Sequence, residues 1–366
     1  MHLLIGTRAG LFVLAGDPTW KRARRYGPLL SRRSVGPFSS VDGTALAAVG
    51  GALYRSHDGL RWARLGETPT GLRLWSLAAG DSMLYAGTEP AALLRSQDGG
   101  RTWQELSGLR AHPSAAEWWG PWQLPLTQAI VLDPQQDDHV YAAISVAGVF
   151  HGRLRGGMDD RWDAVNAGIA PLVPRAAQRD DVHRDVQNLV RLPAHNQETD
   201  TPPILLAATP HALYRTEGDG RWVELVGRGA PRGVRALAVD APSGLVFAVP
   251  LGAGAPAEAP LVRGQLTVCR SADGGQSWEP LSMGLPDDAR CFVHRDALTL
   301  ERTTTDGSLR LYLGTSAGEV YWSPNGGQDW QRLAAGLPSV RALGLVRRDR
   351  SAGRARGRWS WPFGRA

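Results

Sequence analysis

The sequence predicts an all-β protein, a seven-bladed β-propeller formed by residues 1–346, and three observations lead to this prediction. A short glycine-rich turn followed by tryptophan recurs along the chain. The recurring tryptophans are 41 to 60 residues apart, a period typical of four-stranded propeller blades with insertions in the longer units. A last apolar segment, residues 340–346, nearly copies an earlier strand and can close the ring.

The turn is clearest in RSQDGGRTW, residues 95–103. Its aspartate can accept hydrogen bonds from nearby backbone N–H groups, and glycine adopts a positive φ at no steric cost. The tryptophan then begins the next strand and buries apolar surface between neighbouring sheets. The residues expected to build the first two turns and their anchors are Ser96, Asp98, Gly100, Trp103, Ser271, Asp273, Gly275 and Trp278.

A third turn departs from this pattern. In WSPNGGQDW, residues 322–330, Asn325 stands in place of the aspartate and Trp330 is the anchor. An amide oxygen can accept the same hydrogen bonds, so we predict that the turn is retained. The turns lack the alternating acidic ligands of a calcium loop, so we expect their role to be structural.

Seven units follow from the tryptophans. They end at Trp20, Trp62, Trp103, Trp162, Trp222, Trp278 and Trp330. Each has an apolar strand rich in small residues, such as LYAGT (84–88), then a strand leading into the turn. Innermost strands are expected at residues 34–40, 74–80, 127–133, 186–192, 234–240 and 292–300. The first unit lacks one, and VRALGLV (340–346), a near copy of VRALAVD (234–240), should supply it and remove the open edges of the ring.

This strand order places the turns on one face of the ring. The loops that enter the innermost strands and those after the LYAGT-like strands gather on the opposite face, around the channel, where function is expected. One long loop contains Glu117, Trp118, Trp119 and Trp122. The three tryptophans form one of two things. They are a platform that binds a sugar or a partner's apolar side chain, or they are a plug that packs the loop onto the ring.

A second polar stretch, residues 180–185, enters the fifth innermost strand. Its alternation, HRD at residues 183–185, would direct His183 and Asp185 to one side, towards the channel mouth, with Arg184 between them in the sequence and His211 in the adjacent loop. The group is either a metal or acid–base site or a polar network that closes the channel mouth. No tight histidine spacing supports a metal, and no cofactor is expected. Arg8 and Glu89 occupy equivalent loops, as ligand contacts or as solvated residues.

Composition limits the partners and the compartment. The 366 residues contain no apolar run long enough for a membrane span, the start does not look like a signal peptide, and the two cysteines fit a reducing cytoplasm. The net charge of +6 resides in residues 347–366, an Arg/Trp-rich tail. We expect this tail to be disordered, or else to contact a membrane surface or a nucleic acid weakly.

The turns, together with LLIGTRAGLFVL (3–14) and DVHRDVQNLV (181–190), resemble bacterial BNR/Asp-box repeat proteins of the sialidase-like (WD40/YVTN/BNR-type) propeller superfamily. A similar group is the seven-bladed photosystem II assembly factor. The resemblance implies a propeller, and members are often labelled glycosyl hydrolase or exo-α-sialidase. The Arg-Ile-Pro motif of catalytic sialidases is absent from this sequence.

We therefore predict a non-catalytic binding or assembly module that takes a protein or glycan ligand on the channel face. The alternative is a glycan-active hydrolase or lyase. That activity would require two carboxylates, such as Glu117 and Asp185, at a spacing suited to acid–base chemistry.

Overall fold

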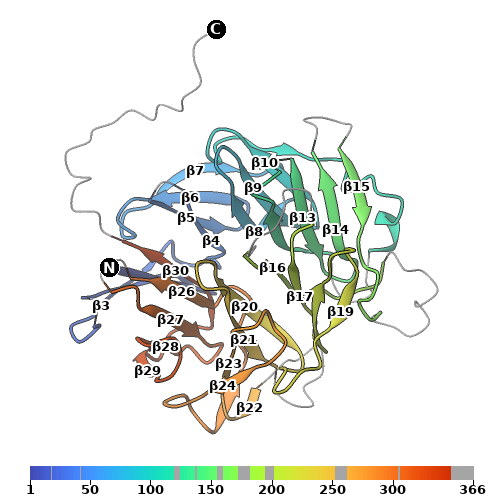
Figure 1. The fold of residues 1–366 in the computed structure, drawn as a ribbon. Helices are drawn as coiled ribbons and strands as arrows, with labels where there is room; N and C mark the ends of the chain where they lie inside the picture. The colour runs from blue at the N-terminus through green and yellow to red at the C-terminus, as the bar shows by residue number, and fades with distance from the viewer. Residues whose placement is uncertain are drawn as a thin grey trace.

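The chain folds into a closed ring of seven four-stranded antiparallel sheets, as the sequence predicts (Figure 1). The computed structural model describes residues 1–17, 19–41, 43–118, 124–136, 138–154, 160–171, 182–193, 202–251, 262–303 and 306–347, with the backbone alone at 262 and 263. The tail from residue 348, Trp119 and Trp122 lie outside these residues. None of the described segments is a helix that is long and apolar enough to cross a bilayer.

The blades are numbered in chain order, and their strands are given from the innermost outward. Blade 1 contains β30 (Val340–Val346), β1 (His2–Thr7), β2 (Gly10–Ala15) and β3 (Arg24–Leu29). Blade 2 contains β4 (Phe38–Val41), β5 (Thr44–Val49), β6 (Ala52–Ser56) and β7 (Ala63–Glu67). Blade 3 contains β8 (Arg73–Ala79), β9 (Leu84–Glu89), β10 (Leu93–Ser96) and β11 (Gln104–Glu105). Blade 4 contains β12 (Thr127–Leu132), β13 (His139–Ile144), β14 (Gly148–Arg153) and β15 (Arg161–Ala164).

The remaining three blades have the same order. Blade 5 contains β16 (Asn188–Arg191), β17 (Leu205–Ala208), β18 (Leu213–Thr216) and β19 (Trp222–Glu224). Blade 6 contains β20 (Val234–Asp240), β21 (Leu245–Pro250), β23 (Val268–Ser271) and β24 (Glu279–Leu281). Blade 7 contains β26 (Leu298–Arg302), β27 (Leu309–Gly314), β28 (Val320–Ser323) and β29 (Gln331–Ala334). Outside the blades lie a two-stranded sheet of β22 (Val262–Gly264) and β25 (Ala289–Cys291) and one 3-10 turn, η1 (Ala115–Glu117).

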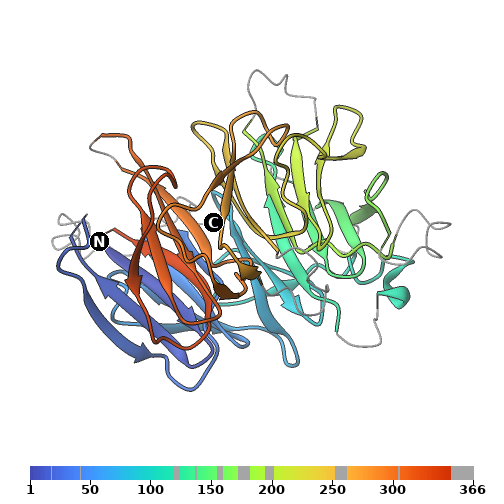
Figure 2. The same ribbon diagram turned by 90° about the horizontal axis from the view of Figure 1, so that it is seen from below.

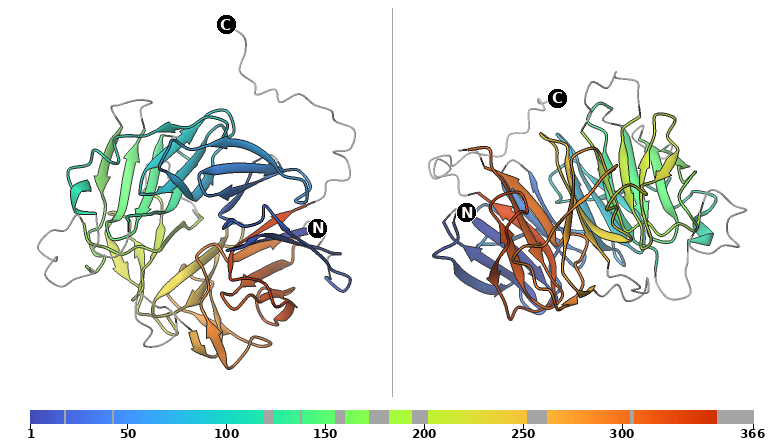
Figure 3. Two further views of the ribbon diagram at one scale, coloured as in Figure 1. Left: turned by 180° about the vertical axis from the view of Figure 1, so that it is seen from behind. Right: turned by 60° about the horizontal axis from the view of Figure 1, so that its bottom comes forward.

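The last strand closes the ring by completing the first blade. β30 pairs antiparallel with β1 along its whole length, from Thr7 opposite Val340 to His2 opposite Val346. The first and last parts of the chain consequently lie side by side (Figures 2 and 3). This closure leaves no innermost strand of the described ring without a partner, which confirms the prediction made from residues 340–346.

Small residues are required where the sheets converge. A side chain at Gly87 of β9 would meet the Ser76 hydroxyl of β8 at 2.2 Å and the Thr127 side chain of β12 at 2.5 Å. Ser76 in turn donates a hydrogen bond of 2.8 Å to the Thr127 carbonyl of the next blade. The LYAGT-like pattern is therefore the signature of the second strand, which lies just outside the axis.

Each tryptophan anchor joins its blade to the one before it. Trp222 of blade 5 donates from its indole N–H to the Val165 carbonyl after blade 4, at 2.6 Å. Trp20 of blade 1 makes an edge-to-face contact with Tyr312 of blade 7, with ring centroids 6.1 Å apart. Trp278 packs in one apolar cluster with Leu206 of blade 5. The anchors therefore hold the ring together from blade to blade.

The first turn has the hydrogen bonds predicted for it. The Asp98 carboxylate accepts from the Ser96 hydroxyl at 2.7 Å, from the Thr102 N–H at 2.9 Å and from the Thr102 hydroxyl at 2.6 Å. Although burial opposes it, this set of donors lowers the pKa of Asp98. Gly100 has a φ of +94°, and a Cβ there would lie 2.3 Å from Leu53, so glycine is required twice over.

The third turn, residues 322–330, keeps the same arrangement although its sequence differs. The Asn325 amide oxygen accepts from the Ser323 hydroxyl at 2.9 Å and from the Asp329 N–H at 3.0 Å, as predicted. Its amide N–H donates to the Asp329 carboxylate at 2.7 Å. Asn325 and Asp329 thus exchange the donor and acceptor roles that Asp98 and Thr102 have in the first turn.

Three innermost strands begin later than predicted, and the shift is smallest for β16, which starts at Asn188 instead of residue 186. β4 starts at Phe38 instead of residue 34, and β26 starts at Leu298 instead of residue 292. Before β26 the backbone forms a turn in which the Ala297 N–H donates to the His294 carbonyl at 3.0 Å. The correction matters because the polar residues of this turn lie at the centre of the ring.

Candidate functional site

The alternating strand directions divide the loops between two faces, as predicted. All innermost strands begin on one face, which we call the entry face, and the aspartate turns lie on the other, the turn face. The loops after the second strand of each blade also lie on the entry face, because that strand is antiparallel to the innermost one. The predicted loop residues therefore share one face.

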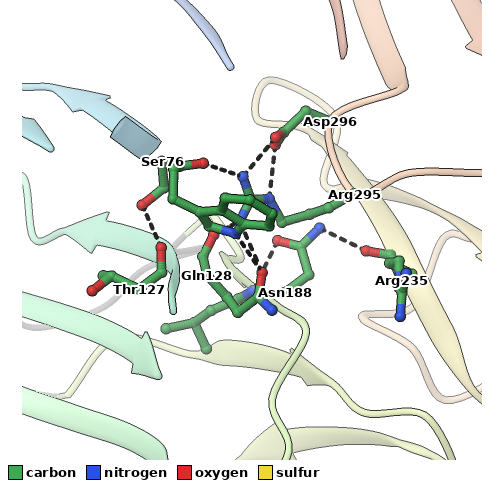
Figure 4. A network of polar contacts seen from close by, with 9 residues as sticks. Ser76, Thr127, Gln128, Asn188, Arg235, Arg295 and Asp296 are labelled. Atoms are coloured by element: carbon green, nitrogen blue, oxygen red, sulfur yellow. Dashed lines mark hydrogen bonds and ion pairs between the residues drawn. The ribbon is translucent and has the colours of Figure 1, made fainter. Parts of the chain in front are cut away.

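A β-bulge marks the start of the innermost strand in four blades. The residue left unpaired by the register shift is Arg341 in blade 1, Trp75 in blade 3, Gln128 in blade 4 and Arg235 in blade 6. A bulge re-aims one side chain relative to its strand. Figure 4 shows two of these residues, Gln128 and Arg235, in the polar network around Arg295.

Arg295 crosses the centre of the ring. It comes from the turn before blade 7, yet it donates to the Trp75 carbonyl of blade 3 at 2.7 Å and to the Gln128 side-chain oxygen of blade 4 at 3.2 Å (Figure 4). It also donates to the Gln128 carbonyl and forms an ion pair with Asp296, at 2.6 Å. Only 9% of its side chain is exposed. Arg295 therefore links opposite sides of the ring.

Two further basic groups face this cross-link. Burial, together with Arg341, Arg235 and Arg295, lowers the pKa of His294 to about 3. The imidazole is thus neutral at physiological pH. Burial also lowers the pKa of the Arg235 guanidinium, with Asp185 opposing and Arg295 adding to the effect. We call Arg235, Arg295, Arg341, His294, Asp296 and Asp185 the axial cluster.

The predicted group at residues 183–185 separates instead of pointing to one side. His183 has a φ of +65°, which breaks the alternation on which that prediction depended. Its imidazole lies 3.6 Å from the Glu117 carboxylate. Asp185 instead accepts a hydrogen bond from Gln187, and burial raises its pKa against the opposing influence of Arg235 and His211. Asp185 and His211 are therefore neighbours, while His183 contacts Glu117 of the tryptophan loop.

Arg184 and Trp118 have structural contacts. Arg184 is 3% exposed and donates to the Ile169 carbonyl at 2.6 Å and to the Val182 carbonyl at 2.8 Å. Trp118 is 2% exposed, packs against Phe150 with ring centroids 4.9 Å apart and donates to the Ser114 hydroxyl at 3.0 Å. Trp118 therefore packs its loop onto the ring, which is the second of the two alternatives given for the tryptophan loop.

The other predicted loop residues surround the axial cluster. Glu89 forms an ion pair of 3.1 Å with Arg73, at the start of blade 3. Arg8 is exposed in the loop after β1. Burial, together with Arg8 and Arg73, lowers the pKa of Arg341, and Glu89 opposes this shift. The two carboxylates proposed for glycan chemistry, Glu117 and Asp185, have different partners, His183 and Gln187.

Sequence reasoning missed the three arginines of the axial cluster. Arg235 and Arg341 had a signal, because VRALAVD and VRALGLV carry arginine at the same position. Arg295 had none, since its contacts are with residues 167 and 220 positions away. Among the described residues, no three His, Cys, Asp or Glu side chains are grouped to hold a metal ion.

The comparisons with known proteins agree on the ring. No protein-family model matches the sequence, and neither does any curated protein. Among solved structures, YCF48 bound to D1 peptide is similar at 17% identity over 82% of this chain and 81% of that one, with a TM-score of 0.52. YCF48 from Cyanidioschyzon merolae covers 82% and 85% at 13% identity and a TM-score of 0.50.

The extracellular domain of BT4673 from B. thetaiotaomicron is also similar, at 12% identity and a TM-score of 0.51, over 82% of this chain and 33% of that one. At such identities the similarity establishes the β-propeller fold alone.

Proposed function

We propose that this chain is a non-catalytic β-propeller that binds a protein partner on its entry face, as a binding or assembly module. The proposal rests on one observation, which is how the charged groups of the entry face are paired. The carboxylates of Glu117, Asp296 and Glu89 each have a basic partner, at 3.6, 2.6 and 3.1 Å. The Nε atoms of Arg235 and Arg341, by contrast, are buried and have no hydrogen-bond partner among the described residues.

This distribution favours recognition over hydrolysis. Acid–base cleavage of a glycosidic bond uses two carboxylates that face one bond, one of them protonated. Glu117 and Asp185 instead face different partners, and arginine is typical of binding surfaces. One similar structure, YCF48, is bound to a D1 peptide, which supports a peptide or protein ligand for this ring as well.

We also propose that the chain is related to the BNR/Asp-box propellers of the sialidase-like superfamily that its sequence resembles. The hydrogen bonds of the aspartate turns support it, and in that superfamily the turns are scaffold. A cytoplasmic location, suggested by the cysteines, also remains a proposal. The two cysteines of the chain, Cys269 and Cys291, are both free and buried.

The test compares the two faces of the ring. The full-length protein, an entry-face variant (Arg8→Glu with His211→Glu) and a turn-face variant (Arg61→Glu) are each used to capture partners from native cells. All three substituted residues are exposed, so the fold should be unaffected. We expect a stoichiometric protein with the wild type and the turn-face variant that is lost from the entry-face variant. Equal capture by all three, or hydrolysis of sialosides that Glu117→Gln abolishes, would contradict the proposal.

A further inference from the structure

Two arginines of the axial cluster have a geometry that points to a ligand. Arg235 and Arg341 occupy the same bulge position in blades 6 and 1, on either side of blade 7. Both side chains are partly buried, and the Nε atom of each is inaccessible to water and has no hydrogen-bond partner in the described structure. A buried donor without a partner is costly, and a buried cation more so.

The backbone of both arginines is fixed. The Arg235 carbonyl accepts a hydrogen bond of 3.1 Å from the Asn188 side chain of blade 5 (Figure 4). β30 beyond Arg341 is paired with β1, and the Leu343 N–H donates to the Asp296 carbonyl at 2.8 Å. The backbone from which each arginine side chain extends is therefore held by neighbouring strands.

The charges of the axial cluster do not cancel. Arg295 is neutralised by Asp296, at 2.6 Å. Asp185 lies near Arg235 but accepts its hydrogen bond from Gln187. Neutral His294 contributes no charge, so the cluster contains three guanidiniums and two carboxyl groups and remains positive. At the rim, Arg73 is paired with Glu89, while Arg8 adds a further exposed cation.

We propose that Arg235 and Arg341 bind a carboxylate group of the partner protein, with His294 as a neighbour of both arginines. This inference rests on the proposed function and names its ligand chemistry. A planar guanidinium binds a carboxylate through two parallel hydrogen bonds. A carboxylate therefore supplies a negative charge that the cluster lacks. The carboxylate comes either from the end of a chain or from an acidic side chain.

Arginine side-chain NMR tests the inference on the full-length protein. The Nε–H signals of Arg235 and Arg341 are assigned through Arg235→Gln and Arg341→Gln. They are then followed during titration with N-acetyl-diglycine, which bears a terminal carboxylate, with its amide, with glutarate and with inorganic phosphate, all at constant ionic strength. We expect both signals to shift and saturate with the two carboxylates and not with the amide.

Arg191 provides the internal control. Its Nε also lacks a partner, but it lies at the end of an innermost strand, on the turn face. Its signal should not move. Arg235→Lys keeps the positive charge but loses the planar guanidinium that forms two parallel hydrogen bonds. We expect it to weaken carboxylate binding at least about tenfold, because one charge-assisted hydrogen bond is lost. In Arg235→Gln the pKa of His294 should rise, because a neighbouring cation has been removed.

Several results would overturn the inference. These are signals that stay in place with every probe, shifts of the same size with the amide, tighter binding of phosphate, an equal response from Arg191, or an unchanged His294 pKa. They are separable from failure of the proposed function. Partner capture that depends on the entry face but not on Arg235 would leave the binding module intact and remove only the carboxylate site.

Discussion

The cross-ring contacts of Arg295 predict that Arg295→Met is among the most destabilising single changes that leave every strand intact. Methionine keeps the apolar stem and removes the donors. The substitution leaves the carbonyls of Trp75 and Gln128 without the guanidinium that binds them, and it deprives Asp296 of its ion-pair partner. Two opposite parts of the ring then lose a direct link.

The lost contacts of Arg295 determine how much stability the substitution costs. Each hydrogen bond from a charged donor contributes about 1.5 kcal/mol, and Arg295 makes two to backbone carbonyls. Asp296 is 34% exposed, so its carboxylate is largely rehydrated and the ion pair adds about 0.5 kcal/mol. We expect a loss of about 3.5 kcal/mol in the free energy of unfolding. With an unfolding entropy of about 2.1 cal/mol/K per residue, a protein of 366 residues should melt about 4–5 °C lower.

Urea denaturation and calorimetry of the purified variant measure this loss. The matched control is Arg64→Met, because Arg64 also pairs with an acid, Glu67, but its side chain is 54% exposed. Exposed pairs contribute little, so this control should lose less than about 0.5 kcal/mol. A loss for Arg295→Met that does not exceed the control would refute the idea that the centre of the ring is held by this side chain.

Three other predictions test the turns, the buried histidine and the closure. Asp98→Ala should lower the free energy of unfolding by about 1–2 kcal/mol and Asp98→Asn by clearly less, since Asn325 supports the same turn; equal losses in urea denaturation would contradict the turn mechanism. The pKa of His294 is about 3 in the folded protein and about 6.5 when unfolded, so its contribution is complete above pH 6.5 and is lost as the pH falls towards 3. Between pH 7 and pH 5 this amounts to about 2 kcal/mol, and His294→Gln should flatten the pH dependence of stability; an unchanged slope would place the titrating group elsewhere. Deleting residues 340–366 should abolish cooperative thermal unfolding, whereas deleting 348–366 removes no described strand and should preserve it; similar melting of the two truncations would argue against closure by β30.

The fold was predictable because its signals are local and repeated. Each turn is defined by residues within a nine-residue segment, such as 95–103, and the donors and acceptors found there are the predicted ones. The closing strand could be predicted because residues 340–346 nearly copy residues 234–240. Repetition therefore supplied both the number of blades and the position of the seam.

The site was less predictable because its contacts connect distant parts of the chain. Arg295 lies 220 residues from the Trp75 carbonyl that it binds, and periodicity contains no information about such a pair. The prediction for His183 and Asp185 was wrong in its geometry because strand alternation was assumed where the backbone has a left-handed residue. Trp118 was left open between two alternatives, and burial against Phe150 decided for packing.

The blades differ from one another at the bulge position of the innermost strand. In the second strand the repeats keep small residues, because a side chain at Gly87 or Gly314 would overlap its neighbours within 2.5 Å. At the bulge, by contrast, four blades carry Trp75, Gln128, Arg235 and Arg341. The fold does not require these side chains, since the bulge forms with each of them. Half-buried arginines lower stability unless something binds them, so a requirement other than folding best explains why two stand at this position. In a ring whose other positions are dictated by packing, the entry face is therefore where ligand recognition should be sought.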